Sequence, residues 1–425
     1  EADAAAAERH MGLFSAVTLI VGQIIGSGIF ASPGPVLVET GSPGMSLIVW
    51  LVAGLVSMMG AYCYAGKWHR LGTMIPASGG EYQYWLQAFG PLAGHIYSWL
   101  MVVFCNSIAI AAIAQVFSLY ACSLVRGFGT VAVAEPLTTT DWTVKLVAVA
   151  TIMLVVLLNC LQRGSGNVVQ NVFTTAKLGA IALIVLIGLY WLATGSIDNF
   201  RHPFEGTSRN PAQYGTAFYF ALFSCTGWNN LNYAAGELKN PRRNLPLAIT
   251  ISLILVIACY VLANVAYFAV LPLDLIRESN TIAMEFGMTT IGPVGKFFMA
   301  VMVAMSAFGA VNGGTIVGSR VAVASAGGQS VFPPCLAHIH SKRGTPVRAL
   351  FFVGGITAFW AVVGDFARLV DTLMCLIWMC YFVTIVGLLR MRIIYPDAPR
   401  PFRVWTPLAV VFCIIAGSLT IVPLL

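Results

Sequence analysis

Eleven apolar segments recur along the chain, and they restrict its fold more than any other feature of the sequence. A helix needs about 20 apolar residues to cross the hydrocarbon core of a bilayer. The segments are continuously apolar, whereas the strands of a membrane β-barrel alternate between apolar and polar residues. The sequence therefore predicts an all-α polytopic membrane protein with spans at residues 12–38, 45–66, 91–123, 144–161, 171–194, 214–236, 246–272, 294–325, 348–364, 368–390 and 405–425.

The composition excludes a water-soluble protein. Only 9% of the residues are charged and 58% are hydrophobic, whereas a soluble domain carries about 25% charged residues. No cluster of His, Cys, Asp or Glu has the spacing of a metal site or of a catalytic acid–base pair. We therefore expect no enzymatic activity, no metal and no cofactor.

The basic residues indicate which side of the membrane each loop occupies. If the N-terminus is cytoplasmic, the 23 Lys and Arg residues divide about two to one in favour of the cytoplasmic loops, as the positive-inside rule requires. The net charge of +7 is thus a signal of topology, and we expect no nucleic-acid partner. We expect a multi-pass protein of the plasma membrane, embedded in the lipid bilayer.

Two of the apolar segments are interrupted near their middle. The first contains Gly26-Ser27-Gly28, and each glycine inside a helix costs about 1 kcal/mol relative to alanine. The sixth contains a similar weak point at residues 223–230, which include Gly227. Because the two interrupted segments lie five segments apart, they predict an inverted repeat of two five-helix halves with a site at the membrane midplane.

This repeat divides the chain into consecutive parts. We expect a cytoplasmic N-terminal segment, a first five-helix repeat, an extracellular loop, a second five-helix repeat and an eleventh helix. A twelfth helix is expected to be missing from the sequence. The corresponding ranges are 1–11, 12–195, 196–213, 214–390 and 391–425.

An interrupted helix leaves free N–H groups at the start of one half-helix and free C=O groups at the end of the other, and lipid can satisfy neither. A ligand with a carboxylate and an ammonium group can bond to both. We place the carboxylate at the N–H groups near Ser27 and Gly28, where the outer half-helix has its positive end. The ammonium group would contact carbonyls near Ile24, Phe223 and Ser224. The alternatives are that the glycines only allow tight packing of helices or that the segment matches a phosphate-binding type of loop by chance. The candidate binding residues are Ile24, Ile25, Gly26, Ser27, Gly28, Phe223, Ser224, Thr226 and Gly227.

Lys177 lies inside the fifth apolar segment, which starts at residue 171. An ionisable residue within a membrane span is a candidate functional residue, because burying its charge is costly. The alternative is that its long side chain reaches the cytoplasmic interface. Position alone leaves both interpretations open.

Six short motifs, spread over most of the chain, match signatures of one known family. They are 20–30, Ser78-Gly79-Gly80-Glu81-Tyr82, Gly227-Trp228-Asn229, 236–246, 308–313 and Thr345-Pro346-Val347. The sequence resembles the amino acid–polyamine–organocation superfamily, and within it the L-type amino acid transporters that form the light subunits of heteromeric transporters.

The resemblance implies a twelve-helix fold with broken helices 1 and 6 that transports amino acids by alternating access, commonly by exchange. In this family the backbone around the Gly26-Ser27-Gly28 break holds the carboxylate and amine of the substrate. Phe223 matches an aromatic residue that closes over the substrate as a gate. Lys177 matches a lysine near the place where sodium-coupled relatives hold an ion, which implies sodium-independent transport.

Three departures from the family pattern refine these expectations. Thr226 stands where exchangers of dibasic amino acids carry an aspartate, so we expect neutral L-amino acids of medium or large size as substrates. Ile377 stands at the position of a family asparagine and makes that wall of the pocket more apolar. The loop 127–142 lacks the cysteine that family members use to bind a glycoprotein, so a disulfide-linked heavy chain is not expected.

Two alternative functions use the same scaffold. A buried lysine can titrate, so Lys177 is also compatible with a proton-coupled symporter of amino acids or polyamines. An amino-acid sensor would bind the same ligand without transporting it. A channel is disfavoured, because one pair of broken helices indicates one occluded site rather than a continuous pore.

Overall fold

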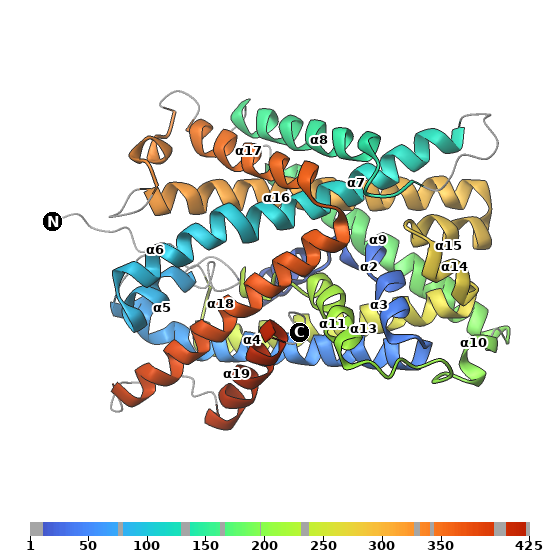
Figure 1. Cartoon of the computed structure of the whole chain (residues 1–425), viewed down its shortest axis with the longest axis horizontal. Coiled ribbons are helices and arrows are strands. Elements are labelled where there is room, and N and C mark those ends of the chain that lie inside the picture. The colour runs from blue at the N-terminus through green and yellow to red at the C-terminus, as the bar shows by residue number, and fades with distance from the viewer. Residues whose placement is uncertain are drawn as a thin grey trace.

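The computed structural model describes residues 12–74, 80–128, 137–161, 166–195, 197–230, 238–326, 332–340, 344–394 and 405–421. Within these residues every regular element is a helix (Figure 1). The prediction of an all-α polytopic chain is thus confirmed. The predicted N-terminal segment 1–11 lies outside the described residues, as do parts of the loop 127–142 and of the range 391–425.

The helices follow the predicted spans closely. In chain order they are α1 (Leu13–Ile24), α2 (Gly28–Ala31), α3 (Pro33–Thr40), α4 (Pro43–Met74), α5 (Gly80–Phe89), α6 (Pro91–Trp99), η1 (Leu100–Asn106), α7 (Ser107–Phe128), α8 (Trp142–Leu161), α9 (Gly166–Ala193), α10 (Asp198–Arg201), α11 (Pro211–Ser224), η2 (Trp228–Asn230), α13 (Pro241–Val270), α14 (Leu273–Glu278), α15 (Ile282–Ile291), α16 (Pro293–Ala326), η4 (Pro334–Ala337), α17 (Val347–Val363), α18 (Phe366–Ile394) and α19 (Thr406–Ile421).

Seven stretches of helix in the described residues are long and apolar enough to cross a membrane. They are Leu13–Ala31, Pro43–Tyr64, Pro91–Arg126, Trp142–Leu161, Arg243–Val270, Pro293–Ala326 and Phe366–Ile394. Four shorter apolar helices cover Lys177–Ala193, Ile282–Ile291, Val347–Val363 and Thr406–Ile421. Length and composition therefore indicate a multi-pass membrane protein.

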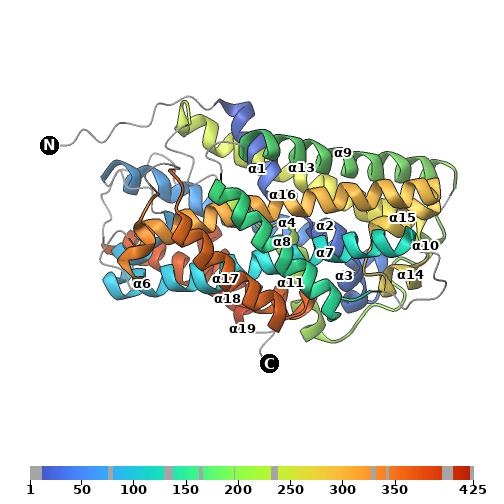
Figure 2. The same cartoon turned by 90° about the horizontal axis from the view of Figure 1, so that it is seen from above.

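The long helices α4, α7, α9, α13 and α16 run in roughly one direction, and α18 crosses them obliquely (Figures 1 and 2). Helix α13 contacts α1, α4 and α9, and α16 contacts α7 and α9. The first broken helix therefore lies against α13. The short helices α10 and α14 lie at one end of the bundle, and α5 lies at the opposite end (Figure 1).

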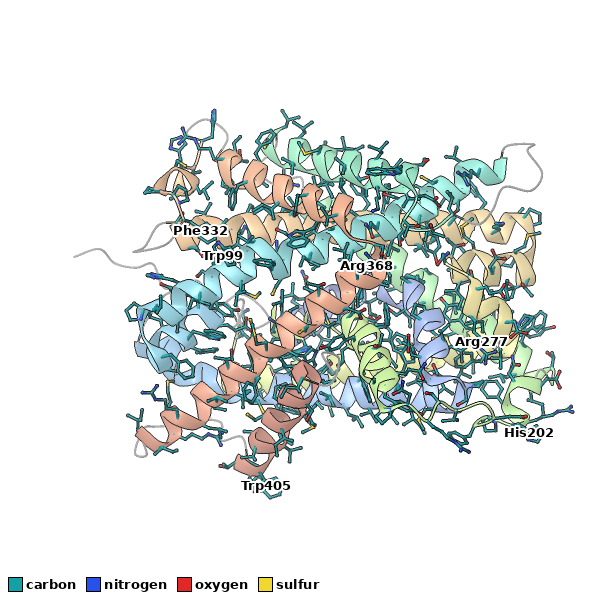
Figure 3. The ribbon with its side chains drawn as sticks, viewed as in Figure 1. Trp99, His202, Arg277, Phe332, Arg368 and Trp405 are labelled. Carbon is teal, nitrogen blue, oxygen red and sulfur yellow. The ribbon has the colours of Figure 1, made fainter. Side chains whose placement is uncertain are left out.

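Several helices were not predicted from the sequence, because they are shorter than a membrane span. Helix α14 packs on α3, and Arg277 at its end donates to the Gly41 carbonyl at 3.1 Å. Arg277 lies at the same end of the bundle as His202 (Figure 3). The third predicted span also differs from expectation: its middle, η1, is a π-helix. The hydroxyl of Ser107, the residue that follows η1, donates to the Val102 carbonyl at 2.8 Å.

The two predicted helix breaks are both present. Helix α1 ends at Ile24, Ile25 is extended with φ −70° and ψ 97°, and α2 starts only at Gly28. Helix α11 ends at Ser224, only 14 residues after its start, and a turn over residues 225–227 follows. Gly227 in this turn has a φ of +112°, which a residue with a Cβ rarely adopts.

Candidate functional site

The two breaks lie directly against each other. A Cβ added at Gly28 would lie 2.7 Å from the Cα of Ser224, the last residue of α11. A Cβ added at Gly227 would lie 3.1 Å from the carbonyl oxygen of Gln23, next to the last residue of α1. Gly28 in the first break therefore lets the end of α11 approach closely, and Gly227 in the second break does the same for the end of α1. These contacts bring together both groups of predicted site residues.

Side chains from three other helices donate hydrogen bonds to the backbone of the first break. In an unbroken helix each carbonyl accepts from the N–H four residues later, and the break removes those donors. Donors from α9, α13 and α16 replace them. The three pairs are Lys177 with the Gly22 carbonyl, Tyr260 with the Ile24 carbonyl (3.1 Å) and Ser306 with the Gly26 carbonyl (3.4 Å).

The first break also presents hydrogen-bond donors that are unused. Among the described residues, the N–H groups of Gly26 and Ser27 find no backbone acceptor. The hydroxyl of Ser27 is buried, with the residue 1% exposed, and it too lacks a partner in the described part of the chain. Buried polar groups are rarely left unsatisfied, so such donors indicate a ligand site.

The second break satisfies most of its groups locally. The Cys225 N–H donates to the carbonyls of Ala221 and Leu222, and the Thr226 N–H donates to Phe223 at 3.2 Å. The Thr226 hydroxyl also donates back to Leu222, at 3.0 Å. The turn therefore forms its own bonds with little help from other helices.

One carbonyl of the second break receives a distant donor. The Tyr260 hydroxyl, which bonds to Ile24, also lies 2.9 Å from the carbonyl oxygen of Ser224. Of the three carbonyls predicted to meet an ammonium group, those of Ile24 and Ser224 therefore converge on one point. The Phe223 carbonyl is instead occupied within its own turn.

Phe223 lies beside the break and packs against the start of α18. The residue is 8% exposed, and its ring meets that of Phe366 edge to face, with centroids 5.8 Å apart. Phe220, one turn earlier on α11, also packs against the ring of Phe366, with ring centroids 6.2 Å apart. An aromatic ring thus covers the second break from α11, and its partner comes from α18.

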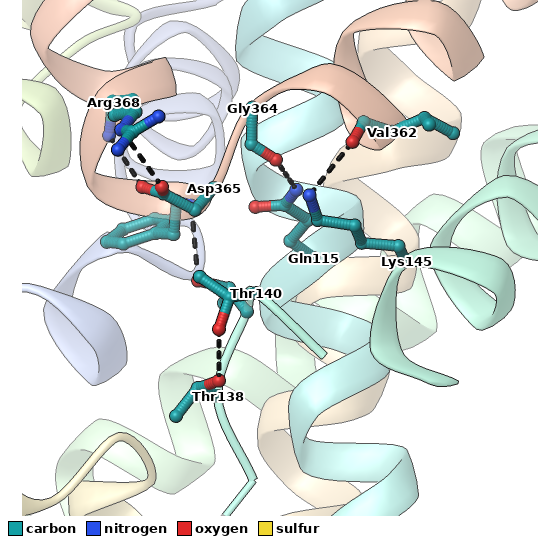
Figure 4. A network of polar contacts seen from close by, with 10 residues as sticks. Gln115, Thr138, Thr140, Lys145, Val362, Gly364, Asp365 and Arg368 are labelled. Atoms are coloured by element: carbon teal, nitrogen blue, oxygen red, sulfur yellow. Dashed lines mark hydrogen bonds and ion pairs between the residues drawn. The ribbon is translucent and has the colours of Figure 1, made fainter. Parts of the chain in front are cut away.

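A polar network fixes the turn that carries Phe366 (Figure 4). The last carbonyls of a helix have no partner within it. At the end of α17 these carbonyls accept from Gln115, which bonds to Gly364 at 2.8 Å, and from Lys145, which bonds to Val362 at 2.9 Å. The Phe366 N–H donates to the hydroxyl of Thr139 at 3.2 Å. The ring that contacts Phe223 is therefore held by α7, α8 and the segment before α8.

Lys177 lies well inside the protein, because its residue is 3% exposed and its ammonium group donates to Gly22. The alternative in which this side chain reaches the cytoplasmic interface is therefore wrong. Among the described residues, no carboxylate forms an ion pair with it. The positive charge of Lys177 thus lies at the carbonyl oxygen of Gly22, two residues before the end of α1.

Sequence reasoning missed Tyr260, Ser306 and Phe366, which complete the surroundings of the breaks. All three lie within or beside predicted spans, where their side chains did not stand out from apolar neighbours. A tyrosine in mid-span is nevertheless a signal, because a buried hydroxyl needs a partner. That argument could have singled out Tyr260, although not the carbonyls it reaches.

Two discontinuous helices, packed break against break inside a bundle of apolar helices, define a class of protein. They are the features of a secondary transporter that binds its substrate near the middle of the membrane. The particular family follows from comparison of the sequence with known proteins. The model of the amino acid permease family matches residues 11–425, and the chain belongs to that family.

Known relatives agree with this assignment. The chain is 39% identical over 416 residues to the b(0,+)-type amino acid transporter 1 of Mus musculus, a match that covers 98% of this chain and 82% of that protein. The human protein of the same name is 37% identical over 418 residues, which cover 98% of this chain and 83% of the relative. The large neutral amino acids transporter small subunit 2 of Homo sapiens is 38% identical over 412 residues, or 94% of this chain and 72% of the relative.

Family membership confirms several predictions from the sequence. The chain is an integral, multi-pass membrane protein of the L-type branch of the amino acid–polyamine–organocation superfamily. It is a transporter of amino acids and not an enzyme.

Proposed function

We propose that the chain carries neutral L-amino acids of medium or large size across the plasma membrane by sodium-independent exchange. The observation that carries this proposal is the buried hydroxyl of Ser27, which lies beside the N–H groups of Gly26 and Ser27; none of these donors has a partner among the residues that the structure describes. Three donors in one place match the carboxylate of an amino acid. The carbonyls of Ile24 and Ser224, which point at one spot, match its ammonium group.

The surroundings of the second break support neutral substrates. Thr226 supplies no counter-charge for a cationic side chain, and its hydroxyl is already bonded to Leu222. One group of relatives is named for large neutral amino acids, which agrees with this preference. Phe223 and Phe366 provide an apolar cover suited to an aliphatic or aromatic side chain.

Lys177 supports sodium-independent transport. Its ammonium group already places a fixed positive charge beside the first break, bonded to the Gly22 carbonyl. A second cation at the same carbonyl would be repelled, because like charges in a medium of low dielectric constant interact strongly. The cytoplasmic N-terminus and the lack of a disulfide-linked heavy chain remain predictions from the sequence.

Counterflow in proteoliposomes tests this function. Liposomes loaded with one unlabelled amino acid are diluted into labelled leucine, with sodium or with choline outside, and with or without a pH gradient. We expect uptake only with neutral L-amino acids inside, equal rates in sodium and choline, and no effect of the pH gradient. Uptake that requires a proton gradient and ignores the internal amino acid would instead show symport. Leucine binding without any uptake would show a sensor.

Substitutions at the breaks test where the substrate binds. Ser27→Leu fills the buried space beside the free donors, and Phe223→Ala removes the aromatic cover, so both variants should lose leucine counterflow. Ser15→Leu, on the exposed face of the same helix α1, is the matched control and should retain it. Normal uptake in both site variants would refute the assignment.

Thr226→Asp tests the origin of the preference for neutral substrates. The new carboxylate would provide the counter-charge that the wild-type break lacks, so arginine should become able to drive leucine counterflow. Thr226→Asn, of similar size and without charge, is the control. Arginine exchange in the wild-type chain would contradict the proposed substrate class.

A further inference from the structure

Three buried polar groups lie where helices α4 and α13 pack side by side (Figure 1). They are the Ser46 hydroxyl and the Trp50 indole N–H of α4, and the Oδ1 atom of Asn264 on α13. Among the described residues none of these three groups has a hydrogen-bond partner, and the three residues are at most 1% exposed. Because buried polar groups are rarely left unsatisfied, they indicate a ligand between the two helices.

The two helices are antiparallel, and two contacts fix their register. Tyr62 of α4 is hydrogen-bonded to Thr250 of α13. Three turns away, the rings of Trp50 and Tyr260 meet edge to face, with centroids 5.6 Å apart. Residue numbers therefore fall along α4 as they rise along α13.

Ser46 and Asn264 continue this register by one more turn. Ser46 comes four residues before Trp50, and Asn264 comes four residues after Tyr260, so the two side chains lie at the same level of the interface. Both side chains are short, whereas the aromatic rings of Trp50 and Tyr260 hold the helices apart one turn away. The interface therefore has space for a small ligand beside the polar atoms.

The pattern of donors and acceptors fits a water molecule. The Nδ2 atom of Asn264 donates to the Tyr260 carbonyl at 2.8 Å, which orients the amide and leaves Oδ1 as an acceptor. The indole N–H can only donate, and the Ser46 hydroxyl can do either. The N–H would repel a cation, and the amide oxygen would repel an anion. Water can accept from Trp50, donate to Asn264 and bond to Ser46, and about three bonds are usual for a buried water.

We propose that α4 and α13 bind a structural water molecule through Ser46, Trp50 and Asn264. Both helices also pack against the broken helices, α4 against α11 and α13 against α1. The water molecule thus joins the two helices that support the breaks. This site is independent of the proposed function, because it needs no substrate.

A structure of the whole protein at a resolution that shows ordered water is the direct test. We expect a density peak about 2.7–3.2 Å from Ser46 Oγ, Trp50 Nε1 and Asn264 Oδ1. The variant Asn264→Leu should lose this peak, because it replaces the acceptor by an apolar group of similar size. A map that shows other buried waters but none here, or a direct hydrogen bond between Ser46 and Asn264, would overturn the inference.

Unfolding temperatures in detergent give a second test. Ser46→Ala removes one partner of the water, so the unfolding temperature should fall by about 1–3 °C. If no water is bound, the hydroxyl is an unsatisfied buried group, and its removal would leave this temperature unchanged or raise it. The losses from Ser46→Ala and Asn264→Leu should be less than additive, because both act on one water molecule. Ser118→Ala is the control: it removes a buried hydroxyl that donates to Ala114 of its own helix, and its effect should add to that of Asn264→Leu.

Replacement of the salt distinguishes water from a bound ion. With choline gluconate in place of sodium chloride, we expect the wild-type unfolding temperature and the loss caused by Ser46→Ala to stay the same. If that loss disappears in choline gluconate, the site holds an ion and the inference is wrong.

Discussion

The first helix break takes its hydrogen-bond donors from neighbouring helices, whereas the second takes most of them from its own turn. Three helices supply Lys177, Tyr260 and Ser306 to the carbonyls of the first break. At the second break the N–H groups of Cys225 and Thr226 close the turn locally, and Tyr260 is the distant donor. The two breaks look alike in sequence but are stabilised differently.

The difference gives each break its own part in the site. The carbonyls of the first break accept from side chains, whereas the N–H groups of Gly26 and Ser27 and the Ser27 hydroxyl find no partner in the described part of the chain and can donate to a ligand. The second break uses its N–H groups in the turn, so it offers the Ser224 carbonyl and an aromatic cover. The first break should consequently be sensitive to distant substitutions, and the second should tolerate loss of its own polar side chains.

The largest difference between the breaks is expected from Lys177→Met compared with Thr226→Val. Loss of the ammonium group leaves the Gly22 carbonyl without its charged donor, and we expect leucine counterflow to fall about 10- to 100-fold. Thr226→Val removes one hydroxyl, but the Leu222 carbonyl still accepts from the Cys225 N–H, so the rate should fall less than about threefold. Rates are normalised to the amount of reconstituted protein. Equal losses would remove the distinction between tertiary and local stabilisation.

Gly28→Ala compared with Gly26→Ala separates contact between the breaks from flexibility within one of them. An added Cβ at Gly28 would lie within 3 Å of three Ser224 atoms, one of them backbone, so the breaks must move apart. We expect a loss of about 1–3 kcal/mol in stability, seen as a lower unfolding temperature of the ligand-free protein in detergent. At Gly26 the nearest atom is the Ile24 carbonyl oxygen at 3.9 Å, and stability should not change. Equal unfolding temperatures would show that the breaks are not in tight contact.

Phe366→Ala tests the aromatic side of the second break, which depends on another helix. Phe223 would lose its edge-to-face partner, and such pairs contribute about 0.5–1.5 kcal/mol beyond burial. Leucine counterflow should therefore fall about 2- to 10-fold. Phe359→Ala on α17, where the side chain is 58% exposed, is the control. If the two variants have the same rate, Phe366 does not support the aromatic cover.

The smallest effect is expected from Ser306→Ala. Its hydroxyl lies 3.4 Å from the Gly26 carbonyl, a long and weak bond, so counterflow should fall only about two- to threefold. Ser319→Ala on the same helix removes a hydroxyl whose bond in the described part of the chain lies within α16, to the Ile316 carbonyl, and should have no effect. A loss as large as that of Lys177→Met would show that all donors to the first break matter equally.

Much of this protein could be predicted from the order of its residues. Apolar runs of membrane length specify helices, because backbone groups in lipid must bond within their own segment. Gly26, Gly28 and Gly227 mark the breaks, because glycine is the residue that helices tolerate least apart from proline. Helices α5, α14 and α15 were not predicted, because neither length nor hydropathy distinguishes a short helix from a loop.

The sequence by itself determined the class of fold, the position of both breaks and the presence of a lysine, Lys177, within an apolar segment. These follow from local chemistry: hydropathy and helix propensity. Only the tertiary structure decided that Tyr260 joins the two breaks, that Lys177 bonds to Gly22 and that Phe366 covers Phe223. Those contacts link residues from different helices, and sequence periodicity specifies which face of a helix is apolar but not which residue of another helix it meets.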